Sequence, residues 1–235
     1  MIERGISLRN NNTTSLAEKA YITLENMIIT LELKPGEVVS ENEISKFLGI
    51  GRMPIREAFK RLESVGLVSI IPRRGILISE IKTAEVFLQL EVRAALEELI
   101  VKRACKYATP SERVRLLELA NEYETATMAN DRTFAIRIDE EFNQLLGKCS
   151  KNPFAWHAIA PFYALSQRSY YYLYEANEAL IREINYAHIG LMRTIADGDE
   201  KKAIDNLNYL LKCTERLIRS DMNTWLPDDD MTTRE

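Results

Sequence analysis

The spacing of apolar residues predicts two helices between Ser15 and about Leu48. From Ser15, apolar residues recur at three- and four-residue steps until a Lys-Pro-Gly-Glu turn at 34–37, which predicts a first helix. Ser40 and Glu43 have the spacing of a capping box, in which the side chain of each residue satisfies an exposed backbone donor of the other. A second helix is therefore expected to begin at Ser40 and to run to about Leu48.

The next segment predicts a third helix followed by a two-stranded hairpin. Pro54 suits the first turn of a helix over 54–65, because its missing N–H has no helical partner there. Two short apolar runs, LVSII and ILISEI, then flank PRRG, in which Gly75 can supply a positive φ. This order predicts a winged helix-turn-helix over 15–80, with 54–65 as the recognition helix and 67–80 as the wing.

Beyond Lys82 the pattern predicts an all-α bundle of six or seven helices over 83–222, so the fold class is mainly α. The expected helices are 83–107, 111–129, 132–149, 153–174, 177–197 and 200–222. The first of them is apolar on most sides, which predicts burial among the others. Residues 1–14 are polar and residues 223–235 acidic, and both are expected to be disordered.

Charge is distributed unevenly along this chain of net charge −4. The segment from Gly51 to Gly75 contains six cationic residues but only two acidic ones, Glu57 and Glu63. These cations are Arg52, Arg56, Lys60, Arg61, Arg73 and Arg74. A basic patch on an acidic body predicts a module that reads a nucleic-acid groove, and it argues against a protein that coats nucleic acid indiscriminately.

The cations have the spacing that major-groove reading requires. Arg52, Arg56 and Lys60 follow one another at four-residue steps, so they share one face of the recognition helix. The fork of an arginine spans O6 and N7 of guanine. Arg73 and Arg74 lie at the tip of the predicted wing, where a neighbouring groove or phosphate would lie. The alternative is a solvated basic face without a ligand.

Composition indicates a cytoplasmic protein. No apolar run approaches the roughly 20 residues needed to span a bilayer, and the N-terminus lacks the apolar region of a signal peptide. The three cysteines are far apart and form no CxxC motif, so they are expected to be buried thiols in a reducing compartment. Two histidines in the whole chain exclude a histidine-rich metal site.

Two regions of the chain carry a resemblance to a known family. One segment of this chain resembles the DNA-binding domain of the GntR family of bacterial regulators: ELKPGEVVSENEISKFLGIGRMPIREAFKRLESVGLVSIIPRRGILIS. A later segment of this chain, LQLEVRAALEELIVKRACKYAT, resembles the opening of the FadR-type (FCD) all-helical effector domain. A further segment, HIGLMRTIADGDEKKA, resembles the later His-containing part of that domain. The resemblance covers about residues 15–220. It implies DNA contacts from Asn42, Arg52, Arg56, Arg73, Arg74 and Gly75, to which the helical spacing adds Lys60. Around Arg52 this chain lacks the serine and threonine that the family often has there.

The resemblance also identifies a degenerate metal site. Many relatives hold a divalent metal with an aspartate, a histidine four residues on, and two later histidines. The matching positions here are Asp139, Asn143, His188 and Leu210. Two good ligands fall short of the three or four that a tight zinc site uses, so we expect no metal and no other cofactor. The same cavity is expected to bind an organic effector instead.

Arg93 lies on the nearly all-apolar helix over 83–107. Its guanidinium could bind a ligand carboxylate bidentately, and the resemblance favours this because the same stretch lines the pocket in relatives. It could equally form an internal ion pair with Glu97 or Asp139, or be exposed. His188 lies on an apolar stripe, so it is expected either to be a satisfied core histidine or to contact the ligand.

Tyrosines gather near the middle of the helical region. Tyr163, Gln167, Tyr170 and Tyr174 share one helix face by their spacing. They could stack on a flat effector, or they could complete the core or a dimer contact. The expected effector-binding residues are Arg93, Asp139, Asn143, His188, Tyr163 and Tyr170.

The function expected from these features is that of a homodimeric transcription repressor. It would bind a near-palindromic double-stranded DNA operator and be released by a small anionic, carboxylate-type metabolite. An activator or a dual regulator has the same architecture. An all-helical metal-dependent enzyme is a remote alternative, because no nucleophile–base pair and no full ligand set is visible. A nonspecific architectural DNA-binding protein fits poorly with an acidic chain.

Overall fold

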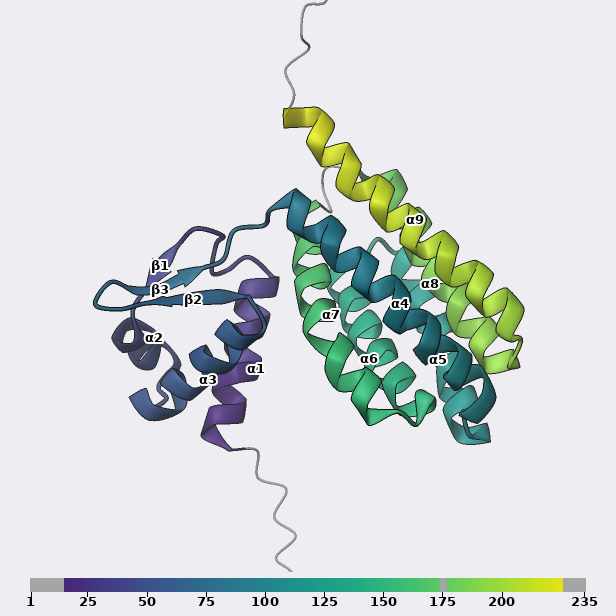
Figure 1. The fold of residues 1–235 in the computed structure, drawn as a ribbon, viewed down its shortest axis with the longest axis horizontal. Coiled ribbons are helices and arrows are strands. Elements are labelled where there is room, and N and C mark those ends of the chain that lie inside the picture. The colour runs from purple at the N-terminus through teal and green to yellow at the C-terminus, as the bar shows by residue number, and fades with distance from the viewer. Residues whose placement is uncertain (1–14, 174–176, 226–235) are drawn as a thin grey trace, which may run out of the picture. The chain divides into compact units, whose positions relative to one another are not determined.

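The computed structural model describes residues 15–173 and 177–225 and divides the chain into two compact units, with the principal boundary between Ser79 and Glu80 (Figure 1). The predicted disorder of 1–14 falls outside the described residues. The predicted disorder of the acidic tail, 223–235, also falls outside the described residues from 226 onward. Residues 223–225 instead belong to the last helix, which continues to Trp225. Tyr174 also lies outside the described residues.

The first unit is a winged helix-turn-helix, as the sequence predicts. Its helices are α1 (Leu16–Ile29), α2 (Glu41–Leu48) and α3 (Arg52–Ser64). Its strands are β1 (Val38–Val39), β2 (Val68–Ile71) and β3 (Gly75–Ile78). They form an antiparallel sheet in the order β1-β3-β2, in which Val68 pairs with Ile78 and Ile71 with Gly75. The sequence did not predict β1, because a two-residue strand has no periodicity to detect.

Local signals fix the start and end of α2. The Ser40 backbone N–H donates to the Glu43 carboxylate at 3.0 Å, and the Glu43 N–H donates to Ser40 Oγ at 3.2 Å, which completes the capping box. Gly49 ends the helix in the left-handed conformation, with φ of 66°. The chain can therefore turn sharply into α3, whose inward residues Ile55 and Phe59 are fully buried.

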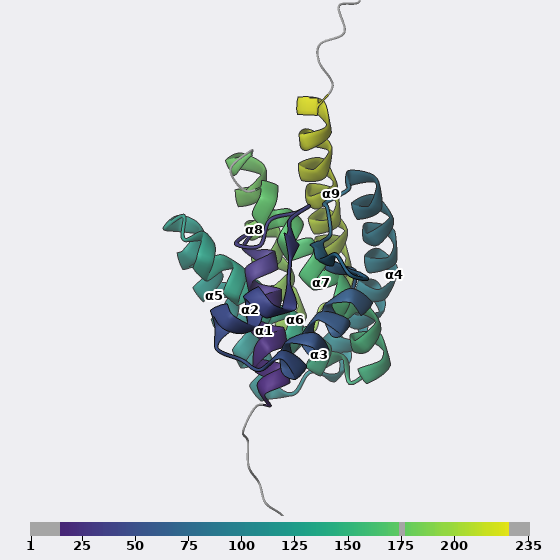
Figure 2. The same ribbon diagram turned by 90° about the vertical axis from the view of Figure 1, so that its left-hand side faces the viewer.

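The second unit consists of six helices in the described part of the chain. They are α4 (Thr83–Tyr107), α5 (Pro110–Met128), α6 (Arg132–Ser150), α7 (Pro153–Leu173), α8 (Glu178–Asp197) and α9 (Glu200–Trp225). α4 packs against α6, α7 and α9, and α8 packs between α5 and α9 (Figures 1 and 2). None of the described helices is long and apolar enough to cross a bilayer.

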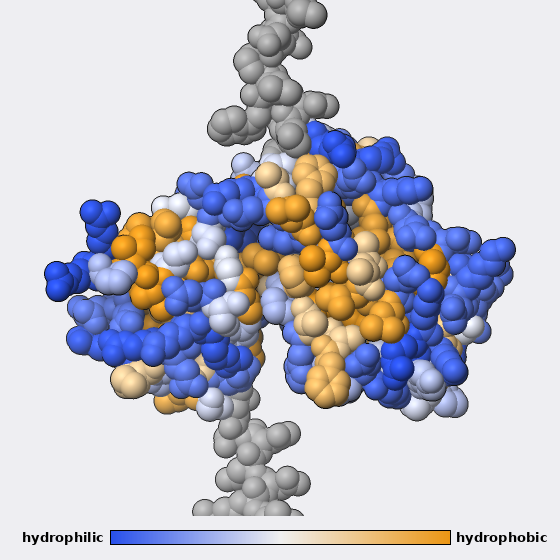
Figure 3. All heavy atoms as spheres, viewed as in Figure 1, coloured by the Kyte–Doolittle hydropathy of each residue, from blue (hydrophilic) through white to orange (hydrophobic). Residues whose placement is uncertain are grey.

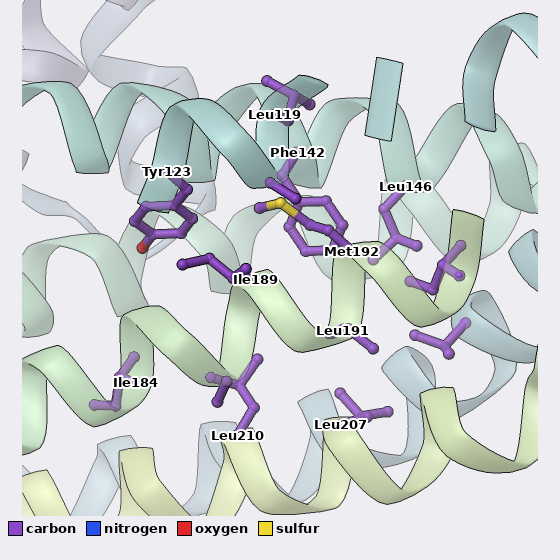
Figure 4. Close-up of a cluster of buried hydrophobic side chains, with 14 of the residues drawn as sticks. Leu119, Tyr123, Phe142, Leu146, Ile184, Ile189, Leu191, Met192, Leu207 and Leu210 are labelled. Carbon is purple, nitrogen blue, oxygen red and sulfur yellow. The ribbon is translucent and has the colours of Figure 1, made fainter. Parts of the chain in front are cut away.

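One continuous apolar core holds this helical unit together (Figure 4). It contains Leu119 of α5, Phe142 of α6, Met192 of α8 and Leu207 and Leu210 of α9, all buried. Burying a side chain of this size stabilises the fold by about 1.5–3 kcal/mol. The cysteines of the chain, Cys105, Cys149 and Cys213, are free and buried.

Arg113 of α5 joins the ends of two helices. Its guanidinium donates to the carbonyl of Cys105 at 2.6 Å and to that of Ala108 at 3.2 Å, at the end of α4. It also donates to the carbonyls of Ile195 and Ala196, at 2.9 and 2.8 Å, near the end of α8. Carbonyls in the last turn of a helix have no N–H four residues on to accept from, and of these four that of Ile195 also accepts from the Gly198 N–H at 3.0 Å. One side chain therefore supplies donors to two helix ends.

α4 packs among the other helices, as predicted, but one of its apolar sides is exposed. Leu88, Val92 and Leu99 are 62%, 44% and 44% exposed. They follow one another with Ala95 at four- and three-residue steps, so they form a stripe along one side of the helix. Figure 3 shows hydrophobic residues gathered over α4 and α7 on this face. We call Leu88, Val92, Ala95 and Leu99 the α4 stripe.

Candidate functional site

The recognition helix α3 presents its cations on the side opposite its core contacts. Ile55 and Phe59 face inward, whereas Arg52, Arg56 and Lys60 are exposed. Gly51 occupies the N-cap position, so no side chain caps the first N–H groups of the helix. An uncapped helix N-terminus with adjacent arginines can accept a phosphate.

Arg56 is held by a carboxylate from the preceding helix. Its Nε lies 2.9 Å from Oε1 of Glu41 and its Nη2 lies 2.7 Å from Oε2, a forked ion pair between α3 and α2. The interaction with Arg56 lowers the pKa of Glu41. Exposed ion pairs are weak and are screened by salt, so Arg56 can exchange Glu41 for a DNA phosphate or base. Asn42, the next residue of α2, is exposed.

The wing tip is a tight turn that exposes two arginines. Arg73 has a φ of 65°, and Arg74 closes the turn by donating its N–H to the carbonyl of Ile71 at 3.0 Å. Gly75 has a φ of 120°, and a Cβ there would lie 2.7 Å from the carbonyl oxygen of Val39. Position 75 therefore needs glycine both for its backbone angle and for the close approach of β1.

The second unit encloses a cavity of about 60 Å³ between its helices. The six residues expected to bind an effector all line it, although they come from four helices. They are Arg93 of α4, Asp139 and Asn143 of α6, Tyr163 and Tyr170 of α7, and His188 of α8. Their role as effector contacts stays a prediction, but the fold does bring them together.

Asp139 is the centre of a polar network on one wall. Its Oδ2 accepts from Asn143 at 3.1 Å and from Gln167 at 3.3 Å. Its Oδ1 lies 3.1 Å from Nε2 of His188, while Nδ1 of His188 lies 3.0 Å from the carbonyl oxygen of Ile184. Burial raises the pKa of Asp139, but the opposing charges of His188 and Arg93 and the hydrogen bond from Gln167 lower it overall. Asp139 is therefore an ionised acceptor inside the bundle.

Arg93 forms an internal ion pair with Glu97, which is one of the alternatives that the sequence leaves open. Its Nε and Nη2 donate to Oε1 of Glu97 at 3.0 and 2.7 Å, and its Nη1 donates to Ser166 Oγ at 2.7 Å. The guanidinium also lies over the ring of Tyr163, 5.5 Å from its centre. Arg93 lines the cavity at the same time, so an ion pair and a ligand contact are compatible.

Comparison with known proteins identifies both units. Residues 16–78 match the family model of the bacterial regulatory proteins of the gntR family, and residues 89–212 match that of the FCD domain. The chain belongs to the GntR family and carries an FCD domain. It is a DNA-binding transcription regulator of the GntR/FCD type.

Its similarity to individual relatives extends over most of the chain. The HTH-type transcriptional repressor RspR of Escherichia coli K12 is 26% identical over 93% of this chain and 97% of its own length. An HTH-type regulator from the TAR-I ttuE-ttuC' intergenic region of Agrobacterium vitis is 36% identical over 56% of this chain and 78% of its own length. The structure of E. coli McbR/YncC, 24% identical, shows the same fold with a TM-score of 0.79 over 90% of this chain and 100% of that one.

The metal site of FCD relatives is not complete in this member. Leu210 belongs to the apolar core cluster (Figure 4), and the amide nitrogen of Asn143 is used to donate to Asp139. Among the described residues, no three His, Cys, Asp or Glu side chains gather as a metal site would require. Asp139 and His188 alone do not fit a tightly bound ion, and the absence of metal stays a prediction.

Sequence reasoning missed two polar residues of the cavity wall, Ser166 and Tyr123, and Asn185 behind it. Ser166 holds Arg93, and Asn185 accepts from the hydroxyls of Tyr170 at 2.8 Å and Tyr123 at 3.3 Å. The ring of Tyr123 also lies 5.7 Å from that of His188. A serine, an asparagine and a lone tyrosine on three different helices carry no spacing signal, so nothing in the sequence marks them.

Proposed function

We propose that this GntR regulator is a homodimeric repressor that a small carboxylate metabolite releases from a near-palindromic operator. The observation that carries the proposal is the combination of an exposed basic helix and wing with a cavity in a separate helical unit, whose mainly apolar wall carries a few charged and polar side chains. The name of the similar E. coli protein RspR supports repression in preference to activation or a dual role. No group of three metal-ligating side chains gathers in the described part of the chain, which disfavours a metal-dependent helical enzyme.

The α4 stripe supports the homodimer. Its leucines and valine are arranged with the heptad-like spacing of a helix–helix seam. Exposed charged residues flank it, among them Glu91, Glu98 and Lys102. An apolar seam with a charged rim is typical of a protein–protein interface. Two-fold symmetry would place two recognition helices on two operator half-sites.

Release follows if the ligand prefers one of two dimer geometries. A ligand shifts a conformational equilibrium only by its difference in affinity for the two states. Residues of all six described helices of this unit, α4 to α9, line the cavity, so a ligand there contacts several helices at once. We expect the ligand-bound geometry to space the DNA-binding units unsuitably for the operator.

DNA binding is tested by scanning the DNA upstream of the native gene in gel-shift and fluorescence-anisotropy titrations at several salt concentrations. Arg52→Ala combined with Arg56→Ala should weaken the specific complex at least about tenfold and lower the salt slope by about two. The control, Lys19→Ala combined with Lys34→Ala, removes the same charge from exposed sites outside α3. Equal operator affinities for the wild type and the Arg52/Arg56 variant would refute the proposal that this face of α3 binds the operator.

The homodimer is tested by sedimentation velocity across a range of concentrations. Val92→Glu places a charge in the middle of the α4 stripe, so the variant should sediment as a monomer. Leu117→Glu makes the same kind of change at an exposed apolar position of α5 and should leave the dimer intact. A dimer that survives Val92→Glu, or a wild type that is monomeric at all concentrations, contradicts this part of the proposal.

A further inference from the structure

We propose that the effector is a small zwitterionic amino carboxylate, with its carboxylate bound to Arg93 and its amino group bound to Asp139. This inference rests on the proposed function, because it names the class of metabolite that enters the cavity of the helical unit. It narrows a carboxylate of unspecified structure to one that carries an amino group beside the acid. Four features of the cavity lead to it.

The first feature is the set of donors that Arg93 has left. A guanidinium carries five N–H groups. Those of Arg93 are used once at Nε and once at Nη2 by Glu97, and once at Nη1 by Ser166. Among the described residues nothing takes the remaining N–H on each terminal nitrogen. Two parallel N–H groups at the end of a guanidinium match the two oxygens of a carboxylate. The side chain is more than nine-tenths buried, and it lines the cavity.

The second feature is an acceptor that is not fully satisfied. Oδ1 of Asp139 is buried and makes no aligned hydrogen bond with any described residue, although Nε2 of His188 lies 3.1 Å away. Leaving a buried charged acceptor without a donor is costly. An ammonium group in the cavity supplies such a donor and also an opposite charge. Asn143 and Gln167 already hold the other oxygen, so the carboxylate is fixed in place for this contact.

The third feature is that the two incompletely satisfied groups require opposite partners. Arg93 has N–H groups left to donate, whereas Oδ1 of Asp139 can accept. A plain carboxylate would leave Oδ1 of Asp139 without a donor, and a plain amine would leave the remaining N–H groups of Arg93 without an acceptor. A zwitterion supplies both partners, which decides between the three.

The fourth feature is size and the apolar remainder of the wall. By the same measure of volume a water molecule needs about 10–15 Å³, so a cavity of about 60 Å³ has room for about four to six waters. Short amino acids such as alanine have about that number of non-hydrogen atoms. Leu90, Ile184 and Leu217 line the cavity as well and suit a short aliphatic side chain. Arg93 and Asp139 both line this one cavity, so one small ligand can reach both charged groups.

Calorimetric titration of the full chain with matched ligands tests the inference. Alanine is compared with propionate, which lacks the amino group, and with alaninamide, which lacks the acid. The comparison is repeated with glycine, 2-aminobutyrate and norvaline and their counterparts, so that one wrong chain length does not decide the outcome. We expect at least one amino acid to bind at least about tenfold more tightly than both of its counterparts, because each counterpart loses a charge-assisted hydrogen bond.

A pair of variants locates the amino group. Asp139→Asn should bring the affinities for the preferred amino acid and its deaminated counterpart close together. Glu140→Gln makes the same isosteric change at the adjacent, exposed residue and should preserve the preference. If Asp139→Asn does not fold, the ligand series on the wild type decides alone.

The outcomes separate this inference from the proposed function. Deaminated acids that bind as tightly as the amino acids overturn it, and so does a failure of every amino acid in the series to bind folded protein. In both cases operator binding, and release by some other metabolite, would leave the proposed function standing. Loss of operator binding by the wild type would instead overturn the proposed function, whatever the titrations show.

Discussion

The buried ion pair between Arg93 and Glu97 offers the sharpest test of how this helical unit is held together. Glu97→Gln keeps the shape of the side chain and an oxygen that can accept from Arg93, so the change removes little but the charge. Arg93 then remains buried with its nearest counter-charge gone. Both side chains are almost inaccessible, at 9% and 4% exposed, and Glu97 is the partner at 2.7 Å.

The expected loss follows from the cost of an uncompensated buried charge. Removing one partner of a buried pair costs about 3–5 kcal/mol, and the amide oxygen left in place favours the lower end. Roughly 140 residues unfold with this unit, which corresponds to an unfolding entropy of about 0.3 kcal/mol per kelvin. A loss of about 3 kcal/mol therefore lowers the unfolding midpoint of the helical unit by about 10 °C. Differential scanning calorimetry of the full chain measures it.

The neighbouring residues of the same helix provide the control. Glu98 and Lys102 have the same four-residue spacing at 2.5 Å, but their side chains are 51% and 45% exposed. Glu98→Gln should leave the midpoint unchanged within error, because water and ions compensate Lys102. Arg93→Met combined with Glu97→Leu should recover much of the loss, since it removes both charges together. A midpoint for Glu97→Gln equal to that of the wild type would show that burial does not strengthen this pair.

Three further predictions concern other parts of the chain. Gly75→Ala forces a Cβ to 2.7 Å from the carbonyl oxygen of Val39 at a φ of 120°, so it should destabilise the winged unit by more than about 1 kcal/mol and weaken operator binding, as measured by thermal unfolding and gel shift. Arg113→Met removes the donors to two helix ends, and hydrogen exchange should accelerate in the last turns of α4 and α8 but not in α2; unchanged protection there would contradict the role of Arg113. Glu112 has a pKa that burial raises but that the hydrogen bonds from Lys151 and Thr109 lower overall, so its stabilisation is present above the unfolded-state pKa of about 4.3 and is lost as the pH falls through the lower folded-state value. Glu112→Gln should therefore show a shallower loss of stability between about pH 5 and pH 3 than the wild type, in denaturant titrations.

Patterns of spacing and chemistry explain what could be predicted of the candidate site. Asp139 and Asn143 share a helix face because they are four residues apart, and His188 lies on an apolar stripe that points it inward. The cavity role assigned to Arg93 came from the resemblance together with the oddity of a cation on an apolar helix. Its actual partners could not be chosen, because Glu97 and Asp139 were both within reach of a helix whose neighbours were unknown.

The sequence alone determined the local structure of this protein. Four features could be predicted without the fold, because each depends on residues only a few positions apart. They are the capping box at Ser40, the turn at Gly49, the spacing of the cations in α3 and the 3.6-residue period of the later helices. Only the tertiary structure decided which face of α4 is buried, that Glu41 holds Arg56, and that polar residues of α4, α6, α7 and α8 enclose one small cavity. Those outcomes depend on contacts between residues far apart in the chain, and a helix period fixes which residues share a face but not what that face will meet.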